Sequence, residues 1–441
     1  MAQQHEEPPA DRLLALLDHL GLGTVHMAAQ IPGEIAKLAQ HHPGRLGGIV
    51  LCAAPRLDPA PFAGVADRIL LIAGEHGMTA EAAQRAAARL AGAEKRILAG
   101  YEPAGWSDVV ADHAAEIAAA MIAFLGRHRA DRPRAPAREG AHAGITYHIE
   151  GAGPALLLLP FFLARSQWLP ALPHLARHFT VATLGGGHLG GVAMLEDRAR
   201  APSYRAMFRT LIDAMKPAPG EPILEVGCGA GSLVRQLAGR LGGANPITGL
   251  DTNPFLLREA AALARDDAVD GQIRFAEGNA EALPFEDGAF GCAYSVTVFE
   301  ECDADRAIAE MVRVTRPGGR IGIAVRAIDM PQWWNLDLPE SIRRKIEAPP
   351  RSVSPGGVAD ASLYRRLRRA GLDELVCFPY LVTLDRPEGP IWRWREDAVV
   401  PLLTPAQAAI WRQRREEALG DGLLFMAHPL HCAVATKAPP T

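Results

Sequence analysis

The spacing of apolar residues in the first part of the chain predicts alternating strands and helices. Short and almost continuous apolar runs alternate with stretches in which apolar residues recur every three or four positions. The first pattern is typical of strands buried on both faces, and the second of amphipathic helices. The apolar runs lie at residues 24–29, 46–54, 67–73 and 95–99, and the helical stretches at 12–20, 34–42, 79–91 and 107–128. This alternation predicts a parallel sheet covered on both faces.

A change of composition follows this first series. Residues 129–143 (RADRPRAPAREGAHA) are rich in Pro, Arg and Ala and have no apolar period, which is typical of an exposed linker. Strand patterns return after it, at 145–149, 154–160 and 179–183, with a helical pattern at the end of 168–178. Glycines between 185 and 191 then interrupt the pattern, so we expect a new domain to begin after them.

The remaining chain again alternates between strand and helix patterns. We expect helices at 204–215, 232–240, 307–316, 363–370 and 405–419, and strands at 222–226, 246–250, 273–276, 290–298, 321–325, 375–384 and 423–436. Residues 326–360, which hold several prolines, lack a simple period. A second sheet covered by helices is therefore predicted.

The most informative stretch is residues 223–231, ILEVGCGAG, where a buried-strand pattern passes through a glycine turn into a helix. Gly227, Gly229 and Gly231 would let backbone N–H groups approach a ligand where a Cβ would collide. Asp251 ends the next strand, where a carboxylate can accept hydrogen bonds from both hydroxyls of a ribose. Enzymes that bind NAD and methyltransferases share both features, so the ligand class stays open at this point.

Two further landmarks carry a resemblance. GNAEALPF (278–285) follows the third predicted strand, and RPGGR (316–320) precedes the fifth. In this order and spacing the chain resembles the class I S-adenosylmethionine-dependent methyltransferases, close to the ubiquinone/menaquinone-biosynthesis type, well over 200–330 and more loosely to 441. The resemblance implies a Rossmann-like fold and S-adenosyl-L-methionine as cofactor, and it disfavours a dinucleotide oxidoreductase.

The resemblance also implies roles for single residues. The three glycines would lie against the methionyl and ribose parts of the cofactor. Glu225 would hold the methionyl ammonium, although a carboxylate that only braces the loop is an alternative. The remaining implied contacts are made by Asp251 to the ribose, Asn279 to the adenine amino group, the Ala280 N–H to the adenine ring, and Ser295 and Val296 beside the sulfonium.

A general base is needed only if the methyl acceptor must lose a proton. The candidates are polar residues at predicted strand and helix ends, each of which can also be structural: Glu300, Glu301, Tyr364, His428 and His431.

Two groups of side chains could contact the acceptor. Trp333 and Trp334 suit a flat, apolar acceptor and equally suit packing anchors. Arginines at 365, 366, 368 and 369 would suit an acidic acceptor or, more simply, form a solvated helix face.

Residues 12–128 resemble the C-terminal half of an α/β-hydrolase, but the positions of its catalytic triad carry other residues. The strand-to-helix elbow that bears the nucleophile falls at residues 28–32, with Gln30 in the place of the serine. The aspartate position falls at Gly77, and the histidine position at Gly105-Trp106. His26, His76 and Ser107 could form a substitute site only on paper. Because an amide cannot attack an ester, we expect no hydrolase activity.

The segment after the linker resembles the N-terminal half of the same fold, so the two halves occur in reversed order. We therefore predict a circularly permuted, degenerate α/β-hydrolase-like domain at 12–190. The alternative is a truncated hydrolase fragment followed by an unrelated segment. Such a domain would act as a scaffold that shapes the acceptor site or mediates formation of a homodimer.

Composition limits the remaining choices. A chain of 441 residues predicts two or three domains, and a net charge of −4 favours neither nucleic acid nor a membrane surface as partner. The six cysteines are scattered without metal-ligand spacing, so we expect reduced thiols and no metal. The chain shows no apolar leader and no run long enough to span a membrane, which predicts a soluble cytoplasmic protein.

These observations together predict an α/β protein with two doubly wound domains. An α/β-hydrolase-like domain at 12–190 precedes a class I methyltransferase domain at 200–441. The predicted function is methyl transfer to a small-molecule acceptor that is apolar or aromatic. The alternative is a non-catalytic protein that binds S-adenosylmethionine or a partner.

Overall fold

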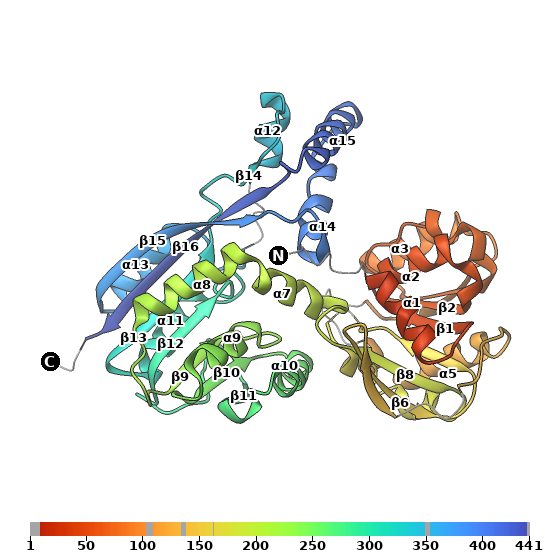
Figure 1. The fold of residues 1–441 in the computed structure, drawn as a ribbon, viewed down its shortest axis with the longest axis horizontal. Helices are drawn as coiled ribbons and strands as arrows, with labels where there is room; N and C mark the ends of the chain where they lie inside the picture. Colours follow the sequence, from red (N-terminus) through yellow and green to blue (C-terminus); the bar gives the residue numbers. More distant parts are fainter. Residues whose placement is uncertain (1–8, 103–108, 134–137, 162, 349–352, 439–441) are drawn as a thin grey trace. The chain divides into compact units, whose positions relative to one another are not determined.

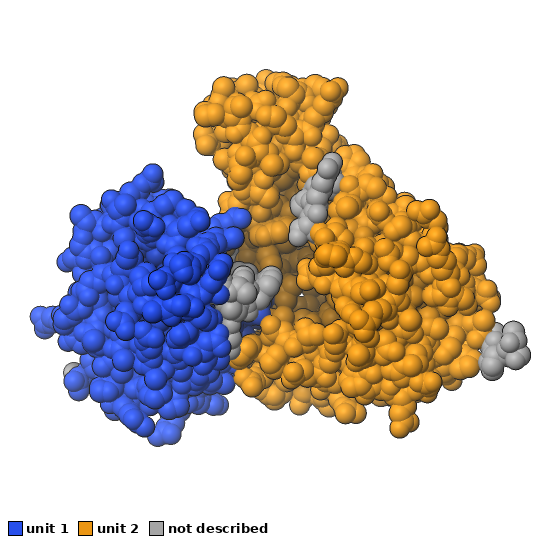
Figure 2. Space-filling view, turned by 180° about the vertical axis from the view of Figure 1, so that it is seen from behind, with its two compact units in different colours: residues 1–193 blue, residues 194–441 orange. Residues whose placement is uncertain are grey.

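The computed structural model describes residues 9–102, 109–133, 138–161, 163–348 and 353–438. The chain divides into two compact units, residues 1–193 and 194–441, which Figure 2 distinguishes by colour. Each unit is built around its own eight-stranded sheet (Figure 1).

The sheet of the first unit has the order β4-β3-β2-β1-β7-β8-β6-β5. Neighbouring strands from β4 to β8 run parallel, whereas β6 is antiparallel to both β8 and β5. The strands are β1 (Val25–Ala29), β2 (Leu46–Cys52), β3 (Ile69–Gly74), β4 (Glu94–Leu98), β5 (Glu139–His142), β6 (Ile145–Gly151), β7 (Ala155–Leu158) and β8 (Thr180–Gly185). The strands from the first half of this unit, β1 to β4, therefore form one side of the sheet. The strands from its second half, β5 to β8, form the other side.

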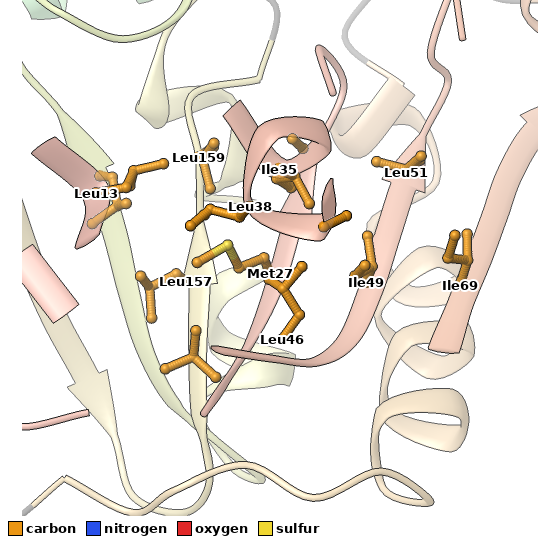
Figure 3. Close-up of a cluster of buried hydrophobic side chains, with 14 of the residues drawn as sticks. Leu13, Met27, Ile35, Leu38, Leu46, Ile49, Leu51, Ile69, Leu157 and Leu159 are labelled. Carbon is orange, nitrogen blue, oxygen red and sulfur yellow. The ribbon is translucent and has the colours of Figure 1, made fainter. Parts of the chain in front are cut away.

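Helices cover both faces of this sheet. One hydrophobic cluster lies under α1 (Pro9–His19), α2 (Gly33–His41) and α3 (Gly77–Ala87). The other lies under α4 (Val109–Asp112), α5 (Ala114–Leu125) and α6 (Leu172–Leu175). Figure 3 shows Met27 and Ile49, which precede the linker, in one cluster with Leu157 and Leu159, which follow it. The two halves thus share one core, because strand residues of both halves alternate between the same two faces.

Two predictions for this unit were wrong in detail. The helix expected at 107–128 is two helices, because the backbone leaves helical geometry at His113 (φ −128°, ψ 31°), and residues 103–108 lie outside the described residues. The expected linker at 129–143 contains β5, which pairs with β6. Such an edge strand forms through its partner, and its four residues are too few to show a period in the sequence.

The sheet of the second unit has the order β11-β10-β9-β12-β13-β16-β14, and β15 pairs with β16. The first five strands are parallel, and the last three are antiparallel to their neighbours. They are β9 (Ile223–Val226), β10 (Ile247–Asp251), β11 (Ile273–Glu277), β12 (Phe290–Val296), β13 (Thr315–Arg326), β14 (Trp333–Trp334), β15 (Leu372–Leu384) and β16 (Met426–Lys437). The strand order reverses between β9 and β12, and ligands of such sheets bind beyond the carboxyl ends at this switch point.

Helices again form a layer on each face of this sheet. One face carries α8 (Pro202–Met215), α9 (Ser232–Leu241) and α10 (Pro254–Asp266), and the other carries α11 (Ala304–Val314) and α13 (Ser362–Arg369). Helix α7 (Gly190–Arg200), which the glycine-rich sequence did not predict, joins the two units along the chain. The predicted Rossmann-like fold is confirmed.

A third cluster of the second unit lies outside these layers. It is formed by β14, α12 (Glu340–Ile346), α14 (Gly389–Asp397) and α15 (Pro405–Gly420), and we call it the tryptophan cluster after Trp334, Trp392 and Trp411. Its segments are inserted after β13 and between β15 and β16. The sequence predicted α15 but neither α12 nor α14, because these short helices depend on contacts between distant segments.

No helix in the described part of the chain combines the length and the apolar content that a membrane crossing would need.

Candidate active site

The glycine turn after β9 has the backbone geometry that the sequence predicted. Gly227, Gly229 and Gly231 have φ values of +78°, +54° and +74°, a region that side chains rarely adopt. A Cβ at Gly227 would lie 2.2 Å from Val298 Cγ2. The turn is fixed to the next strand because Gly227 N donates to Leu250 O (2.7 Å). This cradle exists only with glycine and ends at the N-terminus of α9.

Asp251, the last residue of β10, is held in place by the backbone beside this turn. One carboxylate oxygen accepts the Gly229 N–H (2.8 Å), and the other accepts the Asn253 N–H (2.9 Å). Burial raises the pKa of Asp251, although these hydrogen bonds oppose the shift. Each oxygen keeps a lone pair for a further donor, so the carboxylate is oriented at the strand end to accept two hydroxyls.

Glu225 lies almost fully buried in β9, opposite Tyr294 of β12. The Tyr294 hydroxyl donates to Glu225 Oε2 (3.0 Å). Burial raises the pKa of the Glu225 carboxyl to about 8, although the Tyr294 hydrogen bond opposes the shift. A carboxyl group in this state would ionise when a cation such as an ammonium binds beside it.

The other implied cofactor contacts differ in what their side chains do. Asn279 is exposed, and its Oδ1 accepts the Glu281 N–H (2.9 Å), which fixes the side chain beside the buried Ala280. The Ser295 hydroxyl donates to Val226 O (2.8 Å), and Val296 is part of the core. The side chains of Ser295 and Val296 are thus both buried at the end of β12.

Several residues around this site were missed by sequence reasoning. The Ser232 hydroxyl and the Arg235 guanidinium both donate to Glu196 of α7, which fixes α7 against the start of α9. Tyr204 of α8 is buried and lies beside Thr297, which follows β12 with φ +56°. An apolar period cannot reveal these contacts, because each joins polar residues far apart in the sequence.

Among the candidate bases, Glu300 is buried and Glu301 is exposed. Glu300 Oε1 accepts the Arg326 N–H (2.6 Å) at the end of β13, and Oε2 has no hydrogen-bond partner among the described residues. Burial raises the pKa of Glu300 above its ordinary value, although the Arg326 N–H opposes the shift. This is a usual environment for a carboxylate that accepts a proton.

The two candidate histidines of β16 cannot belong to one site, because side chains three positions apart point to opposite faces of a strand. His428 is buried, and burial together with nearby arginines holds its pKa well below the usual range. His431 bridges the Tyr364 hydroxyl (2.8 Å) and Asp329 Oδ1 (2.7 Å). This chain of three ties α13 and the segment after β13 to β16, which is a structural role.

The two tryptophans after β13 also separate. Trp334 is buried between the rings of Trp392 and Trp411, at 5.5 and 5.0 Å between centres. Trp333 is 46% exposed and packs on Phe425. Trp334 is therefore a packing anchor. In α13, Arg366 pairs with Asp305 (3.0 Å), and the arginines at 365, 368 and 369 are exposed.

In the first unit, the strand-to-helix turn expected from the hydrolase resemblance holds a buried Gln30. It follows β1, precedes α2, and donates from Nε2 to Ala53 O (3.0 Å). Gly77 starts α3, and the expected histidine position and Ser107 lie outside the described residues. His26 accepts the Gly48 N–H (2.8 Å) within the sheet, and His76 is exposed.

Comparison with known proteins finds a methyltransferase domain within the second unit. Residues 223–319 match a family model described as "Methyltransferase domain". The chain is 28% identical over 260 residues to an uncharacterized 37.1 kDa protein in transposon TN4556 of Streptomyces fradiae, over 56% of this chain and 72% of that protein. It is 32% identical over 129 residues to the ubiquinone/menaquinone biosynthesis C-methyltransferase UbiE of Vibrio cholerae, over 29% of this chain and 50% of that enzyme.

The chain thus spans about half the length of the UbiE relatives that it matches. Among solved structures, the [4+2]-cyclase SpnF is similar at 20% identity and a TM-score of 0.36, over 54% of this chain and 82% of that one.

Residues 223–319, with the glycine turn and Asp251, form a class I S-adenosylmethionine-dependent methyltransferase domain. Its cofactor is S-adenosyl-L-methionine. The site fits this cofactor, because it offers a cradle that a Cβ would fill, a carboxylate oriented for hydroxyls, and a buried carboxyl group for an ammonium.

Proposed function

We propose that the whole protein is a methyltransferase that transfers a methyl group from S-adenosylmethionine to a small acceptor with a flat, apolar or aromatic body. The observation that carries the proposal is the fixed Asp251 carboxylate beside the glycine turn, held by the Gly229 and Asn253 N–H groups. This arrangement is prepared for a ribose before any ligand binds, which lowers the cost of binding.

The chain's own residues hold and orient the reactants. Asp251 accepts the ribose hydroxyls, Glu225 accepts the methionyl ammonium, and the glycine turn lets the backbone approach between them. When bound, the cofactor supplies a methyl group on a sulfonium, which is already a good leaving group. Positioning and exclusion of water therefore provide most of the rate acceleration.

We propose Glu300 as the group that takes a proton from the acceptor where one must leave. Glu300 is buried, its pKa is raised, and its Oε2 atom has no hydrogen-bond partner among the described residues. These features support Glu300 over the exposed Glu301. His428 is a weak proton acceptor because its pKa is strongly lowered. His431 is engaged with both the Tyr364 hydroxyl and Asp329.

We further propose that the first unit is a circularly permuted α/β-hydrolase-like domain without catalytic function. Its strand order supports the permutation, because β1 and β7, one from each half, are parallel neighbours at the centre of one sheet. The shared core of the two halves supports a single permuted domain over a truncated hydrolase fragment followed by an unrelated segment. Gln30, which donates to a backbone carbonyl at the strand-to-helix turn, supports the loss of the nucleophile.

Calorimetry with S-adenosylhomocysteine, followed by labelled methyl transfer to candidate acceptors, tests the main proposal. We expect binding that Asp251→Ala weakens at least tenfold, since a charge-assisted hydrogen bond contributes about 1.5–3 kcal/mol. Asp266→Ala, at an exposed position of α10, is the matched control and should bind as the wild type does. Binding without methyl transfer to any acceptor would favour the non-catalytic alternative.

The accessory domain is tested separately with p-nitrophenyl esters. We expect no hydrolysis above the uncatalysed rate. Hydrolysis that Gln30→Ala or His76→Ala abolishes would show an active esterase instead.

A further inference from the structure

Three arginines from three distant segments of the second unit influence one another's charge. Helices α7 and α14 meet where Asp197, next to Arg198, accepts the N–H of Ile391 (3.0 Å), one turn before Arg395. Arg198 is near the end of α7, Arg326 ends β13, and Arg395 is in α14 of the tryptophan cluster. Burial, together with the charges of Arg198 and Arg326, lowers the pKa of Arg395 to about 10. The charges of all three also lower the pKa of the buried His428. We call these three residues the arginine cluster.

Arg395 is the most buried member, with 8% of its surface exposed. Its Nη1 donates to Gln332 Oε1 (3.3 Å), a neutral acceptor, and its Nε has no hydrogen-bond partner among the described residues. At neutral pH its guanidinium remains charged. It is therefore a buried cation whose partner in the described part of the chain is an amide, not a carboxylate.

Arg198 and Arg326 are also cations, so they add positive charge around Arg395. The Arg198 guanidinium lies over the ring of Tyr204, 5.2 Å from its centre, and its Nε also lacks a partner among the described residues. Arg326 Nε contacts Glu300 Oε1 at 3.4 Å. Glu300 is thus a carboxylate in contact with one member of the cluster, Arg326, and burial raises the pKa of Glu300.

Burying cations near one another is costly unless anions or hydrogen-bond acceptors compensate them. The guanidinium group pairs with carboxylate and phosphate through two parallel hydrogen bonds, which makes it suited to recognise either. An anionic ligand would therefore supply the acceptor that the Arg395 guanidinium lacks among the described residues.

The place of the cluster in the fold indicates which ligand this is. The glycine turn and Asp251 follow β9 and β10, on one side of the switch point. Arg326 ends β13 on the other side, next to β12, and the Thr297 N–H after β12 donates to Ala324 O of β13 (2.8 Å). Tyr204, which Arg198 covers, lies beside Thr297. The arginine cluster thus borders the carboxyl ends of β12 and β13, away from the ribose position.

We propose that Arg395, assisted by the charges of Arg198 and Arg326, binds a carboxylate or phosphate group of the methyl acceptor, and that this contact selects anionic acceptors. This inference rests on the proposed function and narrows its acceptor class. The anion could instead be the methionyl carboxylate of the cofactor. The charge of Arg198 also lowers the pKa of Glu225, the residue proposed to hold the methionyl ammonium. The test must therefore separate the two sources.

The experiment uses calorimetry on the full chain, first with S-adenosylhomocysteine and then, with that ligand saturating, with benzoate, phenyl phosphate and neutral benzamide. We expect benzoate or phenyl phosphate to bind at least about tenfold more tightly than benzamide, because a desolvated guanidinium discriminates charge. Arg395→Met should remove this preference and leave the affinity for S-adenosylhomocysteine within about twofold of the wild type. Arg393→Met, on the same helix, is the matched control and should keep both affinities.

Several outcomes would overturn the inference. One is equal or absent binding of all three probes to the wild-type complex. Another is an unchanged preference in Arg395→Met. A third is a loss of S-adenosylhomocysteine affinity in Arg395→Met as large as the loss of probe affinity, which would assign the cluster to the cofactor. If Arg395→Met does not fold, as judged by circular dichroism, Arg326→Met at the more exposed strand end takes its place. Failure of the wild type to bind S-adenosylhomocysteine would instead refute the proposed function.

Discussion

Tyr294 donates a hydrogen bond to Glu225 across the two strands that flank the switch point of the second sheet. The residues are direct neighbours in the β9–β12 pairing, with 3.0 Å between Tyr294 Oη and Glu225 Oε2. Both side chains are buried, so the hydroxyl fixes the carboxyl group whether or not it is ionised. The protonation state of Glu225 therefore depends on what binds beside it.

We predict that binding of S-adenosylhomocysteine becomes tighter as pH rises from 6 to 8. Burial raises the pKa of Glu225 to about 8, so the free protein carries a protonated carboxyl below that pH, whereas the ammonium of the ligand favours the carboxylate. Binding below pH 8 must then release a proton, and the affinity can rise by up to about tenfold per pH unit. Calorimetry in two buffers with different ionisation enthalpies measures the released proton.

The matched variant for this measurement is Glu225→Gln, which keeps an acceptor for Tyr294 but cannot ionise. Its affinity should be lower and independent of pH over the same range. A wild-type affinity that is flat from pH 6 to 8 would show that Glu225 does not contact the ammonium.

A second prediction concerns two glycines that are twelve residues apart. Gly227→Ala should destabilise the protein by about 1–3 kcal/mol and abolish cofactor binding, because its φ is +78° and the new Cβ would meet Val298. Gly239→Ala should stabilise by about 0.5–1 kcal/mol, since Gly239 lies exposed within α9 with nothing within 4 Å of a Cβ. Thermal unfolding and calorimetry check both. Similar losses in the two variants would contradict a special role for the turn.

A third prediction tests the proposed base. Glu300→Gln retains an oxygen that can accept the Arg326 N–H, so the fold and cofactor affinity should be preserved. With an acceptor that must lose a proton, kcat should fall by about 100-fold or more, and the acidic limb of the pH–rate profile should disappear. Glu301→Gln, at the exposed neighbouring position, should leave kcat unchanged. An unchanged profile in Glu300→Gln would assign it a purely structural role.

The adjacent tryptophans provide a fourth prediction. Trp334→Ala should destabilise the tryptophan cluster by about 3–5 kcal/mol, because it removes a buried ring from between two others. Trp333→Ala should have a much smaller effect, since 46% of its surface is exposed. Denaturant unfolding measures both, and equal losses would show that Trp333 is a second anchor.

Local patterns predicted the parts of the site that depend on local structure. The glycine turn and Asp251 belong to one strand, turn, helix and strand in sequence, so a short stretch of chain contains the whole arrangement. The buried strands were predicted for the same reason, because continuous apolar runs leave little choice of structure.

Contacts between distant segments could not be predicted in this way. Tyr294 reaches Glu225 only because β12 pairs with β9, and Arg395 approaches Arg326 only because α14 joins the tryptophan cluster. Nothing in the sequence around Arg395 distinguishes it from Arg393, two positions earlier. The sequence also left open whether Trp333 and Trp334 contact the acceptor or serve as packing anchors, since which one is buried depends on β14 pairing with β16.

The central position of β1 affects how the first unit is made during translation. Its parallel partner on one side, β2, follows within a few tens of residues. Its partner on the other side, β7, comes much later in the sequence, since Leu156 of β7 pairs with His26 of β1. The β1 edge therefore has unpaired backbone groups until more than a hundred residues after β1 have been added, and the half-sheet of β1 to β4 is complete before β7 is made. Unpaired strand edges attract other chains, so this nascent half-sheet is exposed to aggregation, and a chaperone that covers the β1 edge would protect it.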